Sequence, residues 1–342
     1  MRGKPVKSIP SGGKGELALI ERIRQRVGRS AVSGLRLGIG DDCALLRLKP
    51  SEELAVTTDL SIAGRHFRLE WHPPESVGHR TLARGLSDIA AMGARPVAAF
   101  LSLGLPKNLT MAKGRRSAWV DGFLDGFLAL AGKYEMPLAG GDLAESPIVM
   151  ADIVLLGAVP RARALLRSGA RPGDLLYVTG SLGGAAAGLD RLRTLSDRLT
   201  RPTVRPSNMD DLLTPHLWPQ PRIAQGLWLR RRQAATAAID LSDGLSTDLH
   251  HLCEESRVSA EIDAGALPIH TAATLEQALH GGEDYELLFT VRPDTAIPGN
   301  IAGVRVTRIG RIAKKRSGRQ TVMLVDRTVR HPLAACGWQH FS

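Results

Sequence analysis

Five short motifs place aspartate beside glycine, serine or threonine along the chain. They are Gly38-Ile39-Gly40-Asp41-Asp42, Thr57-Thr58-Asp59, Leu86-Ser87-Asp88, Gly140-Gly141-Asp142 and Asp240-Leu241-Ser242-Asp243-Gly244. Each motif alone is typical of a turn or a helix N-cap, because short polar side chains beside glycine favour both. Together they share a pattern in which an apolar run ends in a carboxylate and is followed by glycine or a helix start. Since ligands of α/β sheets bind beyond strand ends, we expect these carboxylates to converge in one polar crevice.

The chemistry of such a crevice follows from its oxygen ligands. Carboxylates without histidine or thiolate neighbours are the ligands that Mg²⁺ prefers, and a cluster of them repels itself unless cations are bound. Backbone amides in Gly-Gly-Asp and Ser-Asp-Gly turns can approach phosphates, so the motifs predict a nucleoside triphosphate site with several Mg²⁺ ions. The sequence has no GxxxxGK[ST] loop and no protein-kinase motif set, and its glycine-rich stretch 180–188 lacks the order of a dinucleotide fingerprint.

Length and composition are those of a globular protein with two domains. The chain has 342 residues, of which 43% are hydrophobic and 23% charged. Its three cysteines lie far apart and form no CxxC or Cys/His pattern, which excludes a disulfide framework and a zinc finger and predicts a reducing, cytoplasmic location. No run of about 18 uncharged apolar residues occurs, so we expect no membrane partner.

The net charge of +11 raises the question of nucleic-acid binding. The basic residues are scattered among acidic ones and only 4% of residues are aromatic, so we expect no nucleic-acid partner. A non-catalytic basic binding protein remains an alternative. It predicts retention on RNA or DNA that is sensitive to salt, and no response to Mg²⁺ with ATP.

Hydrophobic periodicity predicts alternating helices and strands that position these motifs. Helices are expected over 15–27, 74–92 and 119–134, and strands over 54–58, 97–103, 148–159, 174–178, 285–291 and 304–309. Segment 160–173 is rich in Pro, Gly and Arg and is the best candidate domain boundary, whereas 191–221 is expected to be an irregular or exposed connection. The expected fold class is α/β (α+β), with two halves of similar size and a flexible basic tail over 1–14.

Further motifs lie between and after the aspartate motifs, in a fixed order. They are His66-Phe67, Arg167-Ser168-Gly169-Ala170, Tyr177-Val178-Thr179-Gly180, Gly281-Gly282-Glu283-Asp284-Tyr285-Glu286-Leu287 and Gly337-Trp338-Gln339-His340-Phe341. In this order and spacing the whole set resembles the thiamine-monophosphate kinase family, over residues 15–341. Any one motif occurs by chance, but an ordered set of this length is strong evidence.

The resemblance implies the fold of a wider group of ATP-using enzymes that includes aminoimidazole ribonucleotide synthetase, selenophosphate synthetase and a hydrogenase maturation protein. In that fold an N-terminal α/β domain forms an intersubunit β-barrel in a homodimer, and a C-terminal α/β sandwich domain follows. Residues 15–160 would be the ATP- and Mg²⁺-binding and dimerisation domain, and 161–342 would complete the nucleotide and substrate site. The implied reaction is ATP plus thiamine monophosphate giving ADP plus thiamine diphosphate.

The resemblance also implies residue roles by matching position. Asp42, Thr57, Thr58, Asp59, Asp88, Asp142, Asp240 and Asp243 would surround the Mg²⁺ ions; Gly141, Asp142, Arg167 and Ser242 would meet ATP; and His66, Glu283 and Trp338 would meet thiamine monophosphate. Arg167 offers a forked donor for phosphate oxygens, and Trp338 a flat face for a thiazolium cation or a pyrimidine ring. Glu283 would accept from the aminopyrimidine or offset the thiazolium charge. No residue is expected to act as a covalent nucleophile.

Other interpretations of the same residues stay open at this point. Trp338 near the C-terminus would also suit a core position, and His66 beside Phe67 a hydrogen-bonded strand histidine. Ser242 with Asp243 would suit a helix N-cap, and Glu283 an ordinary turn. The main alternative function is another enzyme of the same fold group that acts on a different small acceptor. His66, Glu283 and Trp338 would discriminate, because they lie outside the shared metal cluster.

Overall fold

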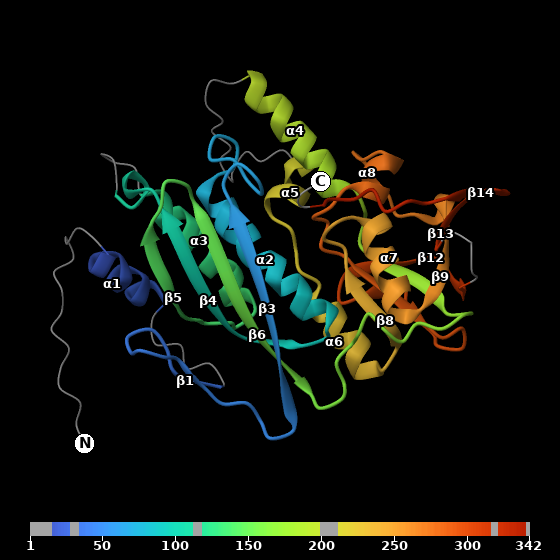
Figure 1. The fold of residues 1–342 in the computed structure, drawn as a ribbon, viewed down its shortest axis with the longest axis horizontal. Coiled ribbons are helices and arrows are strands. Elements are labelled where there is room, and N and C mark those ends of the chain that lie inside the picture. Colours follow the sequence, from blue (N-terminus) through green and yellow to red (C-terminus); the bar gives the residue numbers. More distant parts are fainter. Residues whose placement is uncertain (1–15, 28–33, 112–117, 199–210, 316–320, 340–342) are drawn as a thin grey trace.

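The computed structural model describes residues 16–27, 34–111, 118–198, 211–315 and 321–339, which form two main β-sheets with helices packed around them (Figure 1). This arrangement confirms the mixed α/β class. The tail over 1–14, expected to be flexible, lies outside the described residues. None of the described helices is long and apolar enough to cross a membrane.

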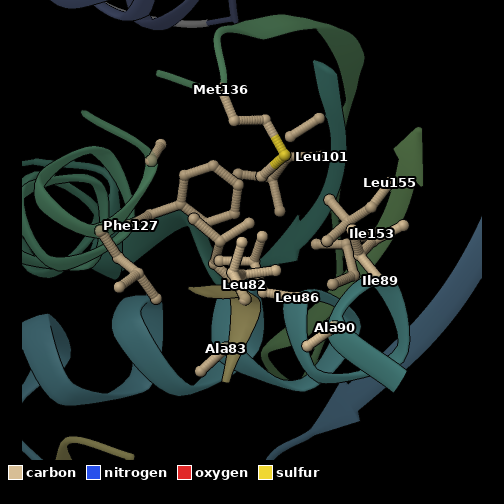
Figure 2. Packing of buried hydrophobic residues seen from close by; sticks show 14 of the residues in the cluster. Leu82, Ala83, Leu86, Ile89, Ala90, Leu101, Phe127, Met136, Ile153 and Leu155 are labelled. Atoms are coloured by element: carbon tan, nitrogen blue, oxygen red, sulfur yellow. The ribbon is translucent and has the colours of Figure 1, made fainter. Parts of the chain in front are cut away.

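The first sheet has four strands in the order β3-β6-β4-β5. They are β3 (Glu52–Ile62), β4 (Arg95–Leu105), β5 (Leu138–Glu145) and β6 (Met150–Pro160). β6 pairs antiparallel with β3 and β4, and β4 pairs parallel with β5. Helices α2 (Pro74–Ala91) and α3 (Trp119–Lys133) pack on one face. Figure 2 shows Leu86 of α2 and Phe127 of α3 in the same cluster as Ile153 of β6.

Helices α2 and α3 approach each other closely because glycine lies at their contacts. A Cβ atom at Gly78 of α2 would lie 1.9 Å from the Phe123 carbonyl oxygen, and one at Gly126 of α3 would lie 1.8 Å from the Glu75 carbonyl oxygen. No side chain fits at such distances. This close packing fixes the position of α2, which carries part of the site described below.

The second sheet has eight strands, seven of which run in the order β14-β13-β9-β12-β7-β10-β8, while β11 pairs with β12. Its strands are β7 (Leu175–Thr179), β8 (Ala235–Asp240), β9 (Val258–Asp263), β10 (Leu287–Val291), β11 (Asn300–Ile301), β12 (Val304–Lys314), β13 (Val322–Asp326) and β14 (Val329–Pro332). The helices of this half are α4 (Gly184–Arg198), α5 (Thr214–Leu217), α6 (Ile223–Arg232), α7 (Leu245–Ser256) and α8 (Leu275–His280).

Helix α2 lies between the two halves, because it contacts β3 and β6 of the first sheet and β8 of the second (Figure 1). One buried cluster accordingly contains Leu86 of α2 together with Phe289 of β10. On the other face of the second sheet, Leu249 of α7 packs with Ile239 of β8. The smaller N-terminal elements are α1 (Glu16–Val27), β1 (Leu35–Leu37) and β2 (Leu45–Leu46). Within the described ranges, 3₁₀ turns cover Lys107–Leu109, Asp211–Leu213 and Ala264–Ala266.

The helices expected over 15–27, 74–92 and 119–134 are confirmed as α1, α2 and α3, and the expected strands are present with longer or shifted ends. The interpretation of 191–221 as irregular or exposed is wrong for its described part. Helix α4 continues through Arg198, and Leu213 and Leu217 are buried against Leu192. These leucines pack on α4, which the polar composition of the segment conceals.

The expectation that the aspartates follow strand ends is wrong for three motifs. Asp59 lies inside β3, Asp88 inside α2 and Asp142 inside β5. Only Asp240 closes a strand, as the last residue of β8. Each of these three carboxylates lies on a polar or exposed side of its strand or helix, where water or a ligand can reach it. A carboxylate is tolerated at such a position.

Candidate active site

A cavity of about 710 Å³ lies between the two halves. Its walls come from the loop after β3, from α2, from the start of α4, from loops 240–243 and 280–285, and from segment 336–338. Eight of the residues that the sequence singled out line it: Asp59, His66, Asp88, Asp240, Ser242, Asp243, Glu283 and Trp338. Motifs that are far apart in the sequence thus converge on one space, as expected.

Helix α2 supplies a row of three charged side chains to this region. Arg80, Arg84 and Asp88 are spaced four residues apart, so they lie on one face of the helix with a rise of about 6 Å between neighbours. Arg80 pairs with Glu283, and Arg84 pairs with Asp59. Asp88 accepts a hydrogen bond from the Thr57 hydroxyl of β3. The helix therefore orders the site from an end at Glu283 to an end at Asp88.

Carboxylates gather at the Asp88 end. The Ser87 hydroxyl donates to Asp240 Oδ2 at 2.7 Å, which brings the end of β8 against α2. Burial raises the pKa of Asp240 well above its usual range, and the charges of Asp88 and Asp248 raise it further. Burial likewise raises the pKa of Asp88, and it raises the pKa of Asp59 to about 6. Ionised, these groups repel one another, so a bound cation would stabilise the ionised cluster.

Arg167 lies near this carboxylate end, although it does not line the cavity. Its charge lowers the pKa of Asp88 and of Asp240, in opposition to the larger effect of burial. Its side chain belongs to an exposed residue. This placement leaves the guanidinium accessible to a ligand that reaches the carboxylates.

Six of the singled-out residues do not line the cavity: Asp42, Thr57, Thr58, Gly141, Asp142 and Arg167. Side chains alternate along a strand, so Thr58 lies on the face of β3 opposite Thr57 and Asp59, and it is exposed there. Asp142 is exposed and pairs in register with Ser102 of β4. Asp42 is exposed between β1 and β2. Their assignment to the metal and nucleotide site stays a prediction.

The opposite end of the cavity is organised by Arg80. Its Nη2 donates to both carboxylate oxygens of Glu283, at 2.7 and 2.8 Å, and to the His66 carbonyl oxygen at 3.3 Å. Burial alone would raise the pKa of Glu283, but the Arg80 charge and hydrogen bonds hold it below its usual value. Glu283 is therefore ionised, and one guanidinium connects it to the His66 turn.

Two buried histidines complete this network. Arg80 Nη1 donates to His216 Nδ1 at 3.1 Å, His216 Nε2 lies 3.0 Å from His72 Nε2, and His72 Nδ1 lies 3.1 Å from the Arg68 carbonyl oxygen. Arg80 can only donate, so His216 accepts at Nδ1 and carries its proton on Nε2. His72 Nδ1 also lies 3.2 Å from the Arg68 backbone N–H. Burial, together with the Arg80 charge, lowers the pKa of His72 to about 3 and that of His216 well below its usual value. Both imidazoles are neutral at physiological pH.

The loop that carries Glu283 is held in an unusual backbone conformation. Glu283 has φ of 67° and Tyr285 has φ of 50°, a region that costs non-glycine residues on the order of 1 kcal/mol each. Backbone bonds from Glu283 N to Ser242 O (2.8 Å) and from Tyr285 N to Leu241 O (2.9 Å) fix the loop against the end of β8. Asp284 accepts from Gly183 N at 2.6 Å and Ala185 N at 3.1 Å, which ties it to the start of α4.

The C-terminal segment closes the wall beside this loop. Trp338 is 50% exposed, which excludes a core position for its ring. Its backbone N–H donates to the Asp243 carbonyl oxygen at 3.0 Å, and Gly337 N donates to Thr247 Oγ1 at 3.0 Å. The N-cap residue of α7 is Gly244, which has no side chain to cap the helix, so neither Ser242 nor Asp243 is its N-cap. A half-exposed indole thus forms part of the cavity wall.

Comparisons with known proteins match both halves of the chain. Residues 40–162 match the AIR synthase related protein N-terminal domain, and 171–322 match its C-terminal domain. Thiamine-monophosphate kinase of Escherichia coli K12 is 44% identical over 285 residues, covering 81% of this chain and 82% of its own. The Bacillus subtilis enzyme is 33% identical over 327 residues, covering 91% and 95%. The chain belongs to the thiamine-monophosphate kinase family.

Solved structures of the same family share the fold of this chain. The crystal structure of thiamine-monophosphate kinase from Stenotrophomonas maltophilia K279a has a TM-score of 0.75 at 38% identity, covering 91% of this chain and 96% of that one. A structure of AaThiL complexed with AMPPCP and TMP has a TM-score of 0.71 at 29% identity, covering 96% and 97%. The hydrogenase maturation protein HypE in complex with ATP shares the fold, with a TM-score of 0.73 at 18% identity.

This member of the thiamine-monophosphate kinase family has site residues that the sequence motifs missed. Arg80 and Arg84 carried a signal, because they lie eight and four residues before Asp88 in a segment already predicted to be helical. The His72–His216 pair carried none, since 144 residues separate its members. Asp248 was also missed; its Oδ2 accepts the backbone N–H groups of 242, 243 and 244 at 3.0 to 3.1 Å and so shapes that loop.

Proposed function

We propose that this chain phosphorylates thiamine monophosphate with ATP, giving thiamine diphosphate and ADP. The observation that carries the proposal is the division of one cavity into two ends. Asp59, Asp88 and Asp240 gather at one end, His66 and Glu283 meet at Arg80 at the other, and Trp338 lines the same cavity. The chain is 44% identical to the Escherichia coli thiamine-monophosphate kinase. Its cavity has one end suited to a phosphate donor and one end suited to a small acceptor.

The acceptor end suits a cationic, aromatic molecule. Glu283 is ionised and held by Arg80, so it presents negative charge to a thiazolium ring or accepts from an aminopyrimidine. Trp338 offers an exposed ring face, which attracts a cation or stacks on a planar heterocycle. His66 is fixed by a hydrogen bond from Ile62 N to its Nδ1 at 3.1 Å. These three side chains would select the acceptor.

The donor end fits Mg²⁺ on the chemistry of its donors. Carboxylate and hydroxyl oxygens dominate it. Burial raises the pKa of Asp59, Asp88 and Asp240, so a bound cation would stabilise their ionised forms. The proposed ligands are Asp42, Thr57, Thr58, Asp59, Asp88, Asp142, Asp240 and Asp243, with Gly141, Asp142, Arg167 and Ser242 at the nucleotide. Bound Mg²⁺ would neutralise phosphate charge.

Transfer would be direct. The acceptor phosphate is an oxygen nucleophile that is largely deprotonated near neutral pH, so neither a covalent intermediate nor a strong general base is needed. The protein positions the two phosphates and offsets their repulsion. Chirally labelled γ-thiophosphate should show inversion at phosphorus. Net retention, or an isolable phosphoenzyme, would overturn this part of the proposal.

We also propose a homodimer in which the first sheet closes a barrel with its partner. Leu54, Val56 and Leu60 of the edge strand β3 are 44 to 55% exposed, on the face opposite Asp59. An apolar edge strand of this kind is normally covered. The domain division would fall between β6 and β7, at 160/161. Sedimentation should give twice the chain mass at micromolar concentration, and a fully active monomer would contradict it.

The function is tested with ATP, Mg²⁺ and a panel of phosphorylated acceptors, with ADP release as the readout. We expect release with thiamine monophosphate and formation of thiamine diphosphate in equal amount. Release with another acceptor alone would support a different enzyme of the same fold group. Salt-sensitive retention on RNA without any ADP release would support the basic binding protein instead.

A further inference from the structure

Arg84 lies midway along the row of charged residues on α2. One turn before it, Arg80 holds the acceptor loop, and one turn after it, Asp88 belongs to the carboxylate end. With a rise of 1.5 Å per residue, Arg84 is about 6 Å along the helix from each. A group that passes from donor to acceptor in this cavity would pass near the Arg84 guanidinium.

The surroundings of Arg84 agree with a place between the two ends. Its side chain is 17% exposed and lines the cavity. Burial lowers the pKa of Arg84, but Tyr285, Asp59, Glu283 and Asp88 raise it by more, so the guanidinium stays charged. Glu283 and Tyr285 belong to the acceptor loop, and Asp59 and Asp88 to the carboxylate end. The charge is thus within electrostatic reach of both.

Arg84 differs from the other arginines of this region. Arg80 is committed to Glu283, to the His66 carbonyl and to His216. Arg65, Arg68 and Arg193 also line the cavity, but they are exposed residues. Arg84 also lines the cavity but is only 17% exposed, and it pairs with the Asp59 carboxylate.

The contacts that hold Arg84 are long. Its Nη2 donates to Asp59 Oδ1 at 3.2 Å and its Nη1 to Ser61 Oγ at 3.4 Å. Charge-assisted hydrogen bonds to carboxylates are normally about 2.7 to 2.9 Å, so these bonds are weak and can be exchanged at low cost. Asp59 is also a proposed Mg²⁺ ligand, which means that a guanidinium and a metal ion compete for one carboxylate.

We propose that Arg84 is a catalytic residue that binds the transferring phosphoryl group and that, in the free protein, takes the place of a cation at Asp59. When Mg²⁺ occupies this carboxylate, the guanidinium turns to phosphate oxygens. This inference rests on the proposed phosphoryl transfer. An oxygen of the acceptor phosphate forms the new bond to the γ-phosphorus, the bond from that phosphorus to the β–γ bridging oxygen breaks, and its electron pair leaves with ADP. Arg84 transfers no proton and stabilises charge on the non-bridging oxygens.

The first test measures Mg²⁺ binding without nucleotide, as the rise in melting temperature over a Mg²⁺ titration. Arg84→Gln removes the competing cation, so we expect its midpoint to move to about 3- to 10-fold lower Mg²⁺ concentration, which corresponds to about 0.7 to 1.4 kcal/mol. Arg84→Lys keeps the charge and should stay near the wild type. Arg311→Gln is the matched control, because Arg311 pairs with Glu261 at 2.7 Å on β12 and β9, which lie in the second sheet.

The second test measures turnover with ATP and thiamine monophosphate. Loss of one preorganised donor to a developing charge typically costs about 10²- to 10³-fold in kcat, so we expect that loss in Arg84→Gln, a smaller loss in Arg84→Lys, and none in Arg311→Gln. Tighter Mg²⁺ binding with slower turnover is a combination that a merely structural role does not produce.

Two results would overturn the inference. A kcat of Arg84→Gln within 3-fold of the wild type would exclude phosphoryl binding, and an unchanged Mg²⁺ midpoint would exclude the exchange at Asp59. If Arg84→Gln fails to fold, Arg84→Met removes the charge in its place for the Mg²⁺ titration, with the same shift expected, and Arg84→Lys carries the turnover measurement, with a kcat loss expected from the missing fork. A wild-type chain that does not use thiamine monophosphate refutes the proposed function separately, and Arg84 is then tested with whichever acceptor releases ADP.

Discussion

Replacing Arg80 by leucine should destabilise the protein and weaken acceptor binding together. The Arg80 side chain is 5% exposed and its loss leaves the Glu283 carboxylate, the His66 carbonyl and His216 without their donor. Removing one partner of a buried ion pair costs about 3 to 5 kcal/mol. Glu283 is 28% exposed, so water can rehydrate it in part, and we expect about 3 kcal/mol. That is a large share of the roughly 5 to 15 kcal/mol by which folded domains are stable.

Urea unfolding measures the change in free energy of unfolding, and initial rates measure KM for thiamine monophosphate. We expect KM to rise 10-fold or more, because Glu283 loses its orientation, while KM for ATP changes little. Arg311→Leu is the matched control, since it removes an arginine from an exposed pair with Glu261 and should cost about 0 to 1 kcal/mol. If Arg80→Leu is within 1 kcal/mol of Arg311→Leu, the reasoning about the buried network is refuted.

Three further predictions concern the metal site and the packing of α3. Asp42→Asn and Asp240→Asn should each abolish turnover with little loss of fold, as judged by ADP release and by thermal melts in EDTA; normal Mg²⁺-dependent activity in either variant would remove that residue from the metal site. Gly126→Ala should lower the free energy of unfolding in urea by several kcal/mol, because its Cβ would lie 1.8 Å from a carbonyl oxygen. Gly132→Ala in the same helix meets nothing within 4 Å and should stabilise the protein by about 0.5 to 1 kcal/mol. Similar changes in the free energy of unfolding for both variants would contradict the close packing of α2 and α3. Burial raises the pKa of Asp59 from 3.8 to about 6, so the contribution of Asp59 to folding stability is favourable below pH 3.8 and is lost as the pH rises through 6. Mg²⁺ needs the ionised carboxylate, so the rise in melting temperature that Mg²⁺ produces should be small at pH 5 and grow above pH 6. A rise that is the same at both pH values would count against this metal site.

Periodicity was sufficient for the helices that frame the site. Apolar spacing predicted the helix over 74–92, and the structure has α2 over Pro74–Ala91. The order of the motifs was sufficient to predict that Asp59, Asp240 and Glu283 share one site, and all three line the same cavity. Both signals are local or ordered along the chain, which is why a single sequence contains them.

The hydrogen-bond networks that join the two halves could not be predicted from the sequence, because they depend on tertiary contacts. Nothing near His216 in the sequence indicates that its ring meets His72, and the polar composition of 191–221 concealed the burial of Leu217. The face of a strand is equally hidden when its register is unknown. Thr57 lies beside Asp88 while its neighbour Thr58 lies on the opposite, exposed face.

The most direct measurement is the yield of thiamine diphosphate per ADP released when the purified protein is incubated with ATP, Mg²⁺ and thiamine monophosphate. The two-ended cavity predicts one thiamine diphosphate for each ADP, with no ADP released when the acceptor or Mg²⁺ is left out. ADP release without formation of thiamine diphosphate, or no release with this acceptor, would contradict the assignment of His66, Glu283 and Trp338 to thiamine monophosphate.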